Sequence, residues 1–361
     1  MEQARSLDVR KKFAGNLKDG VKNLHPAYFA MVMATGIVSI ASGWFGMRSI
    51  GIALFWLNIV TYCILWLMTL ARLIWFCHNF LSDLGDHQRG VGFFTLVAGT
   101  CVLGSQFVVF PQDFRIATPL WFLGILLWIL LIYSIFTAFI FKETKPSLAE
   151  GIHGGWLLVV VATQSVSVLG GLLVPQFELF YREILFFTLA MWLIGGMLYI
   201  WMISLIFYRY IFFKVSLSDL SPPSWITMGA MAISTLAGTT LITNETRSIL
   251  LQEMLPFLKG FTIFFWATGS WWIPVLIIGG IWRHIYKRYK FIYDPLYWGL
   301  VFPLGMYAAA TFQLSTVVTL PFLYEMSRFF IYVALLAWTA TFFGLVHSLL
   351  SKFIGKSFQT R

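Results

Sequence analysis

Two kinds of hydrophobic stretch alternate along this chain. Five stretches rich in Gly, Ala, Ser and Thr are each followed by one rich in Leu, Trp and Phe, such as ALFWLNIVTYCILWLMTLARLIWF at 53–76. Lipid tails favour bulky apolar side chains, whereas close backbone approach or the wall of a narrow pore favours small ones. The alternation predicts an inner ring of small-residue helices within an outer ring of bulky ones. The small-residue stretches read MVMATGIVSIASG, LVAGTCVLGSQ, VVVATQSVSVLGG, MGAMAISTLAGTT and LGMYAAATFQLS.

The lengths of these stretches predict ten membrane spans. The 361-residue chain is 59% hydrophobic and 11% charged, and about 20 consecutive apolar residues cross a bilayer as one helix. We therefore predict an all-α integral membrane fold of ten transmembrane helices. They form five helical hairpins around a central pore, with the odd helices inside and the even helices outside. The charge-free windows are 26–46, 49–71, 90–112, 117–141, 154–175, 184–207, 223–243, 260–282, 295–321 and 329–351.

Basic residues predict the orientation, because cytoplasmic loops carry an excess of Lys and Arg. Of the 25 Lys and Arg residues, 19 fall on the side of the N-terminus and six on the other side. We expect a multi-pass protein of the cell membrane with both termini in the cytoplasm. Residues 1–25 would form an N-terminal arm, 26–351 the ten-helix channel or transporter domain, and 352–361 a C-terminal tail. This topology accounts for the net charge of +10 without nucleic-acid binding.

Residues that carry chemistry avoid the middle of the spans. Every Asp, Glu, Lys and Arg lies outside a window or at its edge, although proton and redox pumps keep such residues at mid-membrane. His25, His153 and His347 lie near the predicted cytoplasmic ends of spans, where capping or interfacial hydrogen bonding is favoured over haem ligation. The three cysteines lack C-x-x-C spacing, and Walker-type, G-x-S-x-G and H-E-x-x-H motifs are absent from the sequence. We expect no metal, no cofactor and no enzymatic activity.

Weakly polar residues gather in the odd spans and leave two readings open. Hydroxyl groups can donate to an anion without trapping it, so as a set they favour the lining of a neutral pore. Taken singly, each is better explained by packing between helices, where a hydroxyl bonds the carbonyl four residues back. The tryptophans gather in the even spans, and we expect those near mid-span to face lipid or a neighbouring subunit. The candidate lining residues are Thr35, Ser39, Thr95, Thr100, Thr163, Gln164, Ser167, Ser234, Thr235, Tyr307 and Thr311.

The same odd spans carry a family resemblance. Together they resemble the tellurite-resistance/dicarboxylate transporter family, which includes the plant slow-type anion channels and the fungal malate and sulfite transporters. Each motif is weak by itself, but the five occur in the same order across all ten spans. The segments are HPAYFAMVMATGIVSIA (25–41), GFFTLVAGTCVLGSQ (92–106), GGWLLVVVATQSVSVLGG (154–171), PPSWITMGAMAISTLAG (222–238) and YWGLVFPLGMYAAATFQLS (297–315).

The resemblance implies an architecture and a gate. Family members place five hairpins around a quasi-five-fold axis, line the pore with the odd helices and assemble as homotrimers. In the channel members a phenylalanine of the ninth helix, within a Trp-x-x-x-Phe-Pro pattern, blocks the pore; here Trp298 to Pro303 fits that pattern, so Phe302 matches the gate. Proline removes a helical hydrogen bond, so a kink is expected at Pro303. Packing between helices is the alternative role for Phe302, and Phe312 is the rival gate.

Three classes of function remain. The leading hypothesis is transport of small anions through a neutral, phenylalanine-gated pore, as in an anion channel or uniporter. The alternative is a secondary carrier that exports a C4-dicarboxylate such as malate, sulfite or a related oxyanion, with or without protons. A membrane enzyme or redox subunit would need ligands or a catalytic constellation that the sequence does not offer. The sequence does not identify the anion, and such short predicted tails argue against regulation by phosphorylation of long tails.

Overall fold

The structure is a computed structural model that describes residues 18–217, 219–290 and 293–358, with side chains described up to residue 351. Its described part is helical, and ten of the helices are long and apolar enough to cross a membrane. The N-terminal arm predicted over 1–25 lies mostly outside the described residues. The five inner helices are α2 (Ala30–Trp44), α5 (Phe94–Val109), α8 (Leu158–Leu173), α10 (Ile226–Thr243) and α13 (Trp298–Val317). The five outer helices are α3 (Arg48–Trp75), α6 (Phe114–Phe141), α9 (Tyr181–Phe212), α12 (Leu255–Ile281) and α14 (Pro321–Phe358).

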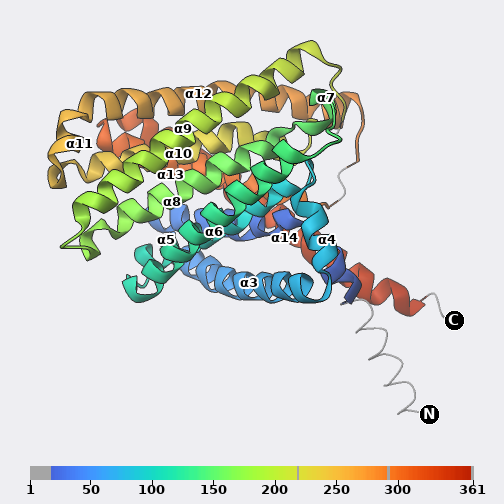
Figure 1. Cartoon of the computed structure of the whole chain (residues 1–361). Helices are drawn as coiled ribbons and strands as arrows, with labels where there is room; N and C mark the ends of the chain where they lie inside the picture. Colours follow the sequence, from blue (N-terminus) through green and yellow to red (C-terminus); the bar gives the residue numbers. More distant parts are fainter. Residues whose placement is uncertain (1–17, 218, 291–292, 359–361) are drawn as a thin grey trace, which may run out of the picture.

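The inner helices form a closed ring. Each contacts the next in chain order, and α13 contacts α2 to complete the circle. Each outer helix packs on the inner helix that precedes it, and α12 and α3 lie on opposite faces of the bundle (Figure 1). The spans that contain the inner helices are 72–94% buried, whereas the outer spans are only 17–50% buried. The alternation of small and bulky stretches therefore separates buried helices from peripheral ones.

Glycines set the spacing of this ring. One glycine stands at each of the five contacts between neighbouring inner helices, and a Cβ atom added there would lie 2.5–2.9 Å from the facing side chain. Such distances are shorter than real Cβ contacts, so a larger residue at any of these positions would push the facing side chain or helix away. The contacts are Gly36 with Val102, Gly104 with Leu169, Gly171 with Thr240, Gly229 with Pro303, and Gly305 with Val38.

Each inner helix begins in the same way. A 3-10 turn precedes it, and a polar or charged residue occupies the N-cap of that turn. The turns are η1 (Pro26–Phe29), η2 (Gly90–Phe93), η3 (Gly154–Leu157), η5 (Pro222–Trp225) and η8 (Pro295–Tyr297), and their N-caps are His25, Arg89, His153, Ser221 and Asp294. These five turns contact one another in ring order, and η8 contacts η1. All five inner helices therefore begin at one end of the bundle and run in the same direction.

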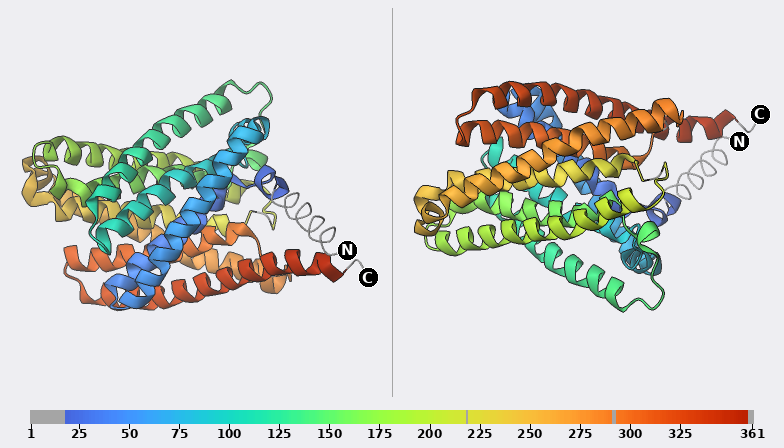
Figure 2. Two further views of the ribbon diagram at one scale, coloured as in Figure 1. Left: turned by 90° about the horizontal axis from the view of Figure 1, so that it is seen from below. Right: turned by 90° about the horizontal axis from the view of Figure 1, so that it is seen from above.

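The outer helices are longer than their charge-free windows. Helix α9 has 32 residues, and α14 begins at Pro321 and continues to Phe358, where it projects past the bundle (Figure 2). Charged residues limit the apolar window but do not interrupt backbone hydrogen bonding, so helices continue through them. Short helices α4 (Cys77–Leu84), α7 (Leu148–Gly151) and α11 (Ile249–Glu253) lie in the connections.

Candidate functional site

Two cavities lie at opposite ends of the inner ring. The N-side cavity has a volume of about 630 Å³ and adjoins the first turns of all five inner helices. The C-side cavity has a volume of about 360 Å³ and adjoins the later turns of the same five helices. Both therefore lie within the ring, at its two ends.

A constant interval separates the two cavities. On four of the inner helices, the last residue that lines the N-side cavity is followed seven positions later by the first that lines the C-side cavity. Seven helical residues span about 10 Å, so a closed zone about two turns thick lies between the cavities. The pairs are Ala30 and Ile37, Leu158 and Ser165, Ile226 and Ile233, and Gly299 and Met306.

Phe302 lies in the stretch of α13 that separates the two cavities. It falls between Gly299 and Met306 on α13, and its side chain is 1% exposed. The neighbouring Pro303 packs against Gly229 of α10, and α13 continues through it without a break in the helix. The kink predicted at Pro303 stays a prediction.

Phe312 lies elsewhere, in an aromatic cluster near the C-terminal end of α13. Its ring stacks on Trp44 at 5.8 Å between centroids and meets Phe45 edge-on at 5.1 Å. Tyr324 of α14 completes the cluster. Phe312 itself lines neither cavity, although its neighbour Gln313 lines the C-side cavity.

Aromatic donors from the outer helices hold the inner helices. At each step, an indole or phenol from the outer helix of one hairpin bonds the inner helix of the next hairpin, and α14 returns to α2 to close the series. Four of the bonds, 2.8–3.1 Å long, join the donor to a threonine hydroxyl, and the fifth ends on a backbone carbonyl. The bonds are Tyr62 with Thr100, Trp128 with Thr163, Trp192 with the Ser234 carbonyl, Trp266 with Thr311, and Trp338 with Thr35.

These four tryptophans direct their indole N–H groups at inner helices, and Trp128, Trp266 and Trp338 are only partly exposed. Trp201 on α9 is 57% exposed, as we had expected of tryptophans near mid-span. Trp192 is 0% exposed, and a buried indole N–H needs a partner. The hydroxyl protons are also engaged: Thr100 and Thr163 each donate to the carbonyl four residues back. These contacts agree with the packing interpretation, and pore lining stays a prediction for the bonded threonines.

The remaining candidates are distributed over several kinds of contact. Thr95 lines the N-side cavity, and its hydroxyl donates to the Gly92 carbonyl at 2.7 Å. The others contact a neighbouring helix or their own helix and line neither cavity. Ser39 donates to Gly51, Gln164 to Trp192, Ser167 to Thr188, and Ser234 and Thr235 to the carbonyls four residues back, while Tyr307 bonds Ser270.

Sequence reasoning missed the polar residues that do line the C-side cavity. Arg247 adds a positive charge there, and the neutral polar residues that line it are Ser105, Ser165, Thr240, Thr243, Asn244 and Gln313. No carboxylate is among the residues that line this cavity. One signal in the sequence could have indicated these residues. Each indole-bonded threonine marks the face of an inner helix that meets an outer helix, so residues close to it in sequence but on another face point away from that outer helix.

We expect loss of one indole bond to lower stability measurably. The Trp338→Phe variant keeps most of the ring and removes the donor to Thr35, so the free energy of unfolding should fall by about 1 kcal/mol. Thr35→Val should cost a similar amount, and the double variant should cost less than the sum, as thermal unfolding in detergent would reveal. Trp75, which is 69% exposed, provides the control: Trp75→Phe should change little. Strict additivity of Trp338→Phe and Thr35→Val would contradict a direct bond.

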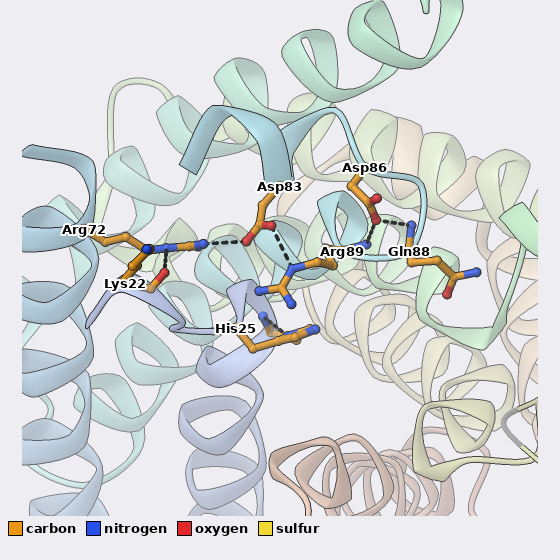
Figure 3. A network of polar contacts seen from close by, with 8 residues as sticks. Lys22, His25, Arg72, Asp83, Asp86, Gln88 and Arg89 are labelled. Carbon is orange, nitrogen blue, oxygen red and sulfur yellow. Dashed lines mark hydrogen bonds and ion pairs between the residues drawn. The ribbon is translucent and has the colours of Figure 1, made fainter. Parts of the chain in front are cut away.

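Charged residues surround the N-side cavity. Asp83 contacts Arg72 at 2.7 Å and Arg89 at 2.8 Å, so it lies between two cations that come from α3 and from the start of η2 (Figure 3). Arg209 and Asp219 form a second pair at 2.7 Å, and both residues are about 8% exposed. Burial alone would raise the pKa of Asp219, but hydrogen bonds from Arg209 and Ser216 outweigh it and hold that pKa below its ordinary value.

Two histidines cap inner helices at the same cavity. The Nδ1 atoms of His25 and His153 accept from the backbone N–H groups of Ala27 and Gly155, both at 3.1 Å. Burial lowers the pKa of each histidine to about 4, and nearby Arg89 adds to the effect at His25. Both line the N-side cavity, whereas His347 is exposed on α14. Their caps agree with the alternative that we favoured over haem ligation, and the described residues contain no group of three potential metal ligands from His, Cys, Asp and Glu.

These caps predict loss of stability in acid. The folded pKa of about 4 lies below the ordinary 6.5, so each histidine contributes stability that is complete above pH 6.5 and is lost as the pH falls toward 4. For each histidine, the free energy of unfolding should fall by on the order of 1 kcal/mol for each pH unit within this range. Thermal unfolding between pH 7 and 4 should show it, and His25→Asn with His153→Asn should flatten the profile. The exposed His78, changed to Asn, should leave the profile as it is.

Comparison with known proteins identifies the family. The SLAC1 family profile, described as voltage-dependent anion channel, matches residues 23–346. An uncharacterized transporter of Methanocaldococcus jannaschii is 26% identical over 300 residues, which are 81% of this chain and 84% of the relative. A sulfite efflux pump of Trichophyton rubrum is 24% identical over 343 residues, 89% of this chain and 90% of its own. The match covers nearly the whole ten-helix ring and confirms the resemblance of the five small-residue segments: the chain belongs to the SLAC1 family of anion-transport proteins.

Proposed function

We propose that this protein conducts a small anion along the axis of its inner ring, as a channel or uniporter. The observation that carries the proposal is the pair of cavities, each lined by all five inner helices and separated by two helical turns. Such a passage is complete except for one short barrier. Transport alone accounts for this arrangement of two cavities, without an enzymatic substrate.

In this proposal Phe302 is the gate. Its buried ring lies in the only stretch of α13 between the two cavities, and an apolar ring in a narrow path excludes water and ions. Pro303 frees the backbone from one helical hydrogen bond beside it, which makes local adjustment of the helix less costly. Rotation of the ring away from the axis would join the cavities.

The lining of the C-side cavity supports a preference for anions. Arg247 contributes positive charge at its mouth, and neutral polar groups such as Ser165 and Gln313 also line it. A cation at a pore mouth raises the local concentration of anions and hence the rate of entry. Of the hydroxyl residues predicted to line a pore, Thr95 lines the N-side cavity.

A secondary carrier is the second candidate. Two cavities that open at opposite ends and are closed from one another also suit alternating access, and the relative from Trichophyton rubrum is named a sulfite efflux pump. In that case the cargo would be sulfite, malate or a related oxyanion. We place the protein in the cell membrane with both termini in the cytoplasm, on the basic-residue asymmetry, and we propose a homotrimer from the family resemblance.

Reconstitution distinguishes the two candidates. The purified protein in planar bilayers or liposomes should give anion currents whose reversal potential follows the anion gradient alone. Accumulation of sulfite or malate against its own gradient, driven by a pH gradient, would favour the carrier instead. Absence of any anion flux from correctly folded protein would reject both.

A further inference from the structure

An arginine recurs at the end of three outer helices. Arg72, Arg209 and Arg283 each donate to a backbone carbonyl shortly before the inner helix of their own hairpin, namely those of Lys22, Ala149 and Leu220. The bonds are 2.7–3.2 Å long. This repeated bond ties the loop between hairpins to the outer helix.

The third arginine lacks the counter-charge of the other two. Arg72 pairs with Asp83 and Arg209 with Asp219, both at 2.7 Å. Among the described residues no carboxylate forms an ion pair with Arg283. Asp294 stands eleven positions after it, as Asp83 stands eleven after Arg72, but Asp294 accepts from the Leu296 N–H at 2.8 Å as a helix cap.

Arg283 is nevertheless buried. It is 6% exposed, it lines the N-side cavity, and its Nε atom has no hydrogen-bond partner in the described part of the chain. Its guanidinium lies 4.3 Å from the centre of the Tyr289 ring, which covers one of its faces. A buried cation without a counter-ion is disfavoured, because no opposite charge offsets its lost hydration.

The free part of the guanidinium indicates the kind of anion. Nη1 is used by the Leu220 carbonyl, which leaves the edge formed by Nε and Nη2. That edge carries two parallel N–H donors, and two oxygens of one carboxylate or sulfite match them, whereas a halide can use the fork only as a point charge. Arg283 lies in the π-helical turn η7 (Trp282–Tyr286) that ends the α12 span, an irregularity often found at functional sites.

We infer that Arg283 forms an oxyanion-binding subsite at the N-side mouth, which favours sulfite or a carboxylate over a halide. The inference rests on the proposed transport function and specifies its substrate class. Before passage, the anion binds Nε and Nη2 of Arg283 in the wide cavity. Release toward Phe302 then breaks only this one two-pronged contact.

The test compares three anions with graded variants. Wild-type protein, Arg283→Lys, Arg283→Gln and the control Lys287→Gln, which removes an exposed charge from the same segment, are reconstituted and assayed with sulfite, malate and chloride. Arg283→Lys keeps the charge but loses the fork, so the half-saturating concentration of the preferred oxyanion should rise about tenfold, equivalent to 1.4 kcal/mol, with little change for chloride. Arg283→Gln should raise the half-saturating concentration of all three anions, and Lys287→Gln should keep the wild-type values.

Direct binding separates this inference from the proposed function. Sulfite or malate should raise the melting temperature of purified wild-type protein by mass action and should do so much less in Arg283→Lys, with size-exclusion profiles confirming that the variants fold. Stabilisation by only one of the two oxyanions identifies the ligand. Transport by all variants with wild-type concentration dependence, or no stabilisation of wild type by either oxyanion, overturns the subsite. Oxyanion stabilisation without any flux would reject transport and leave the subsite standing.

Discussion

Replacement of Phe302 by alanine should raise anion conductance by about tenfold or more. The ring lies in the two-turn zone that separates the cavities and is 1% exposed, so its removal should leave a continuous path. A barrier lowered by only about 1.4 kcal/mol already gives a tenfold increase in rate. Single-channel or liposome flux measurements on the purified variant would report the change directly.

Phe312→Ala is the matched control on the same helix. Phe312 packs with Trp44, Phe45 and Tyr324 and lies outside the closed zone. Phe312 is half-buried, so its loss should lower stability by less than the about 3 kcal/mol of a fully buried phenylalanine. Conductance should stay close to that of wild type. Equal currents for wild type and Phe302→Ala, or an opening by Phe312→Ala alone, would remove Phe302 as the gate.

Asp219→Asn should destabilise the protein more than any surface substitution. The change removes the carboxylate that faces Arg209 at 2.7 Å, where both residues are about 8% exposed. An arginine left buried without its partner costs about 3–5 kcal/mol. The asparagine would also weaken the contact with the Ser216 N–H, now 2.7 Å from a charged oxygen. A marked drop in the melting temperature in detergent is the expected result.

Glu325→Gln provides the comparison, because it also removes one carboxylate from an ion pair. Glu325 and Arg328 are 3.7 Å apart, and their side chains are 68% and 55% exposed. Water screens such a pair, so its loss should cost about 1 kcal/mol at most. If the two variants melt alike, burial does not decide the strength of the Arg209 pair. Arg209→Met combined with Asp219→Leu should regain part of the loss, since no unpaired charge then remains.

The ten spans, their order and their division into inner and outer helices follow from the sequence alone. Bilayer thickness sets the length of an apolar run, and side-chain size reports whether a helix meets protein or lipid. The small-residue stretches that hold the contact glycines, such as Gly36 and Gly305, could also be read from the sequence, because close helix contacts favour residues without bulky side chains. The family segments, including Trp298 to Pro303, could also be recognised without coordinates.

Which residues line the cavities was decided only by the tertiary structure. An inner helix is buried on every side, so all its faces are apolar or weakly polar and no amphipathic pattern marks the axis. Threonines such as Thr163 and Thr311 therefore resemble pore-lining residues, although indoles of neighbouring hairpins bond them. The missing partner of Arg283 is equally invisible in sequence, because Asp294 stands at the right interval and serves a different bond. Side-chain size and hydrophobicity are local properties that a sequence records, whereas the direction of a hydrogen bond depends on helices that meet only after the ring closes.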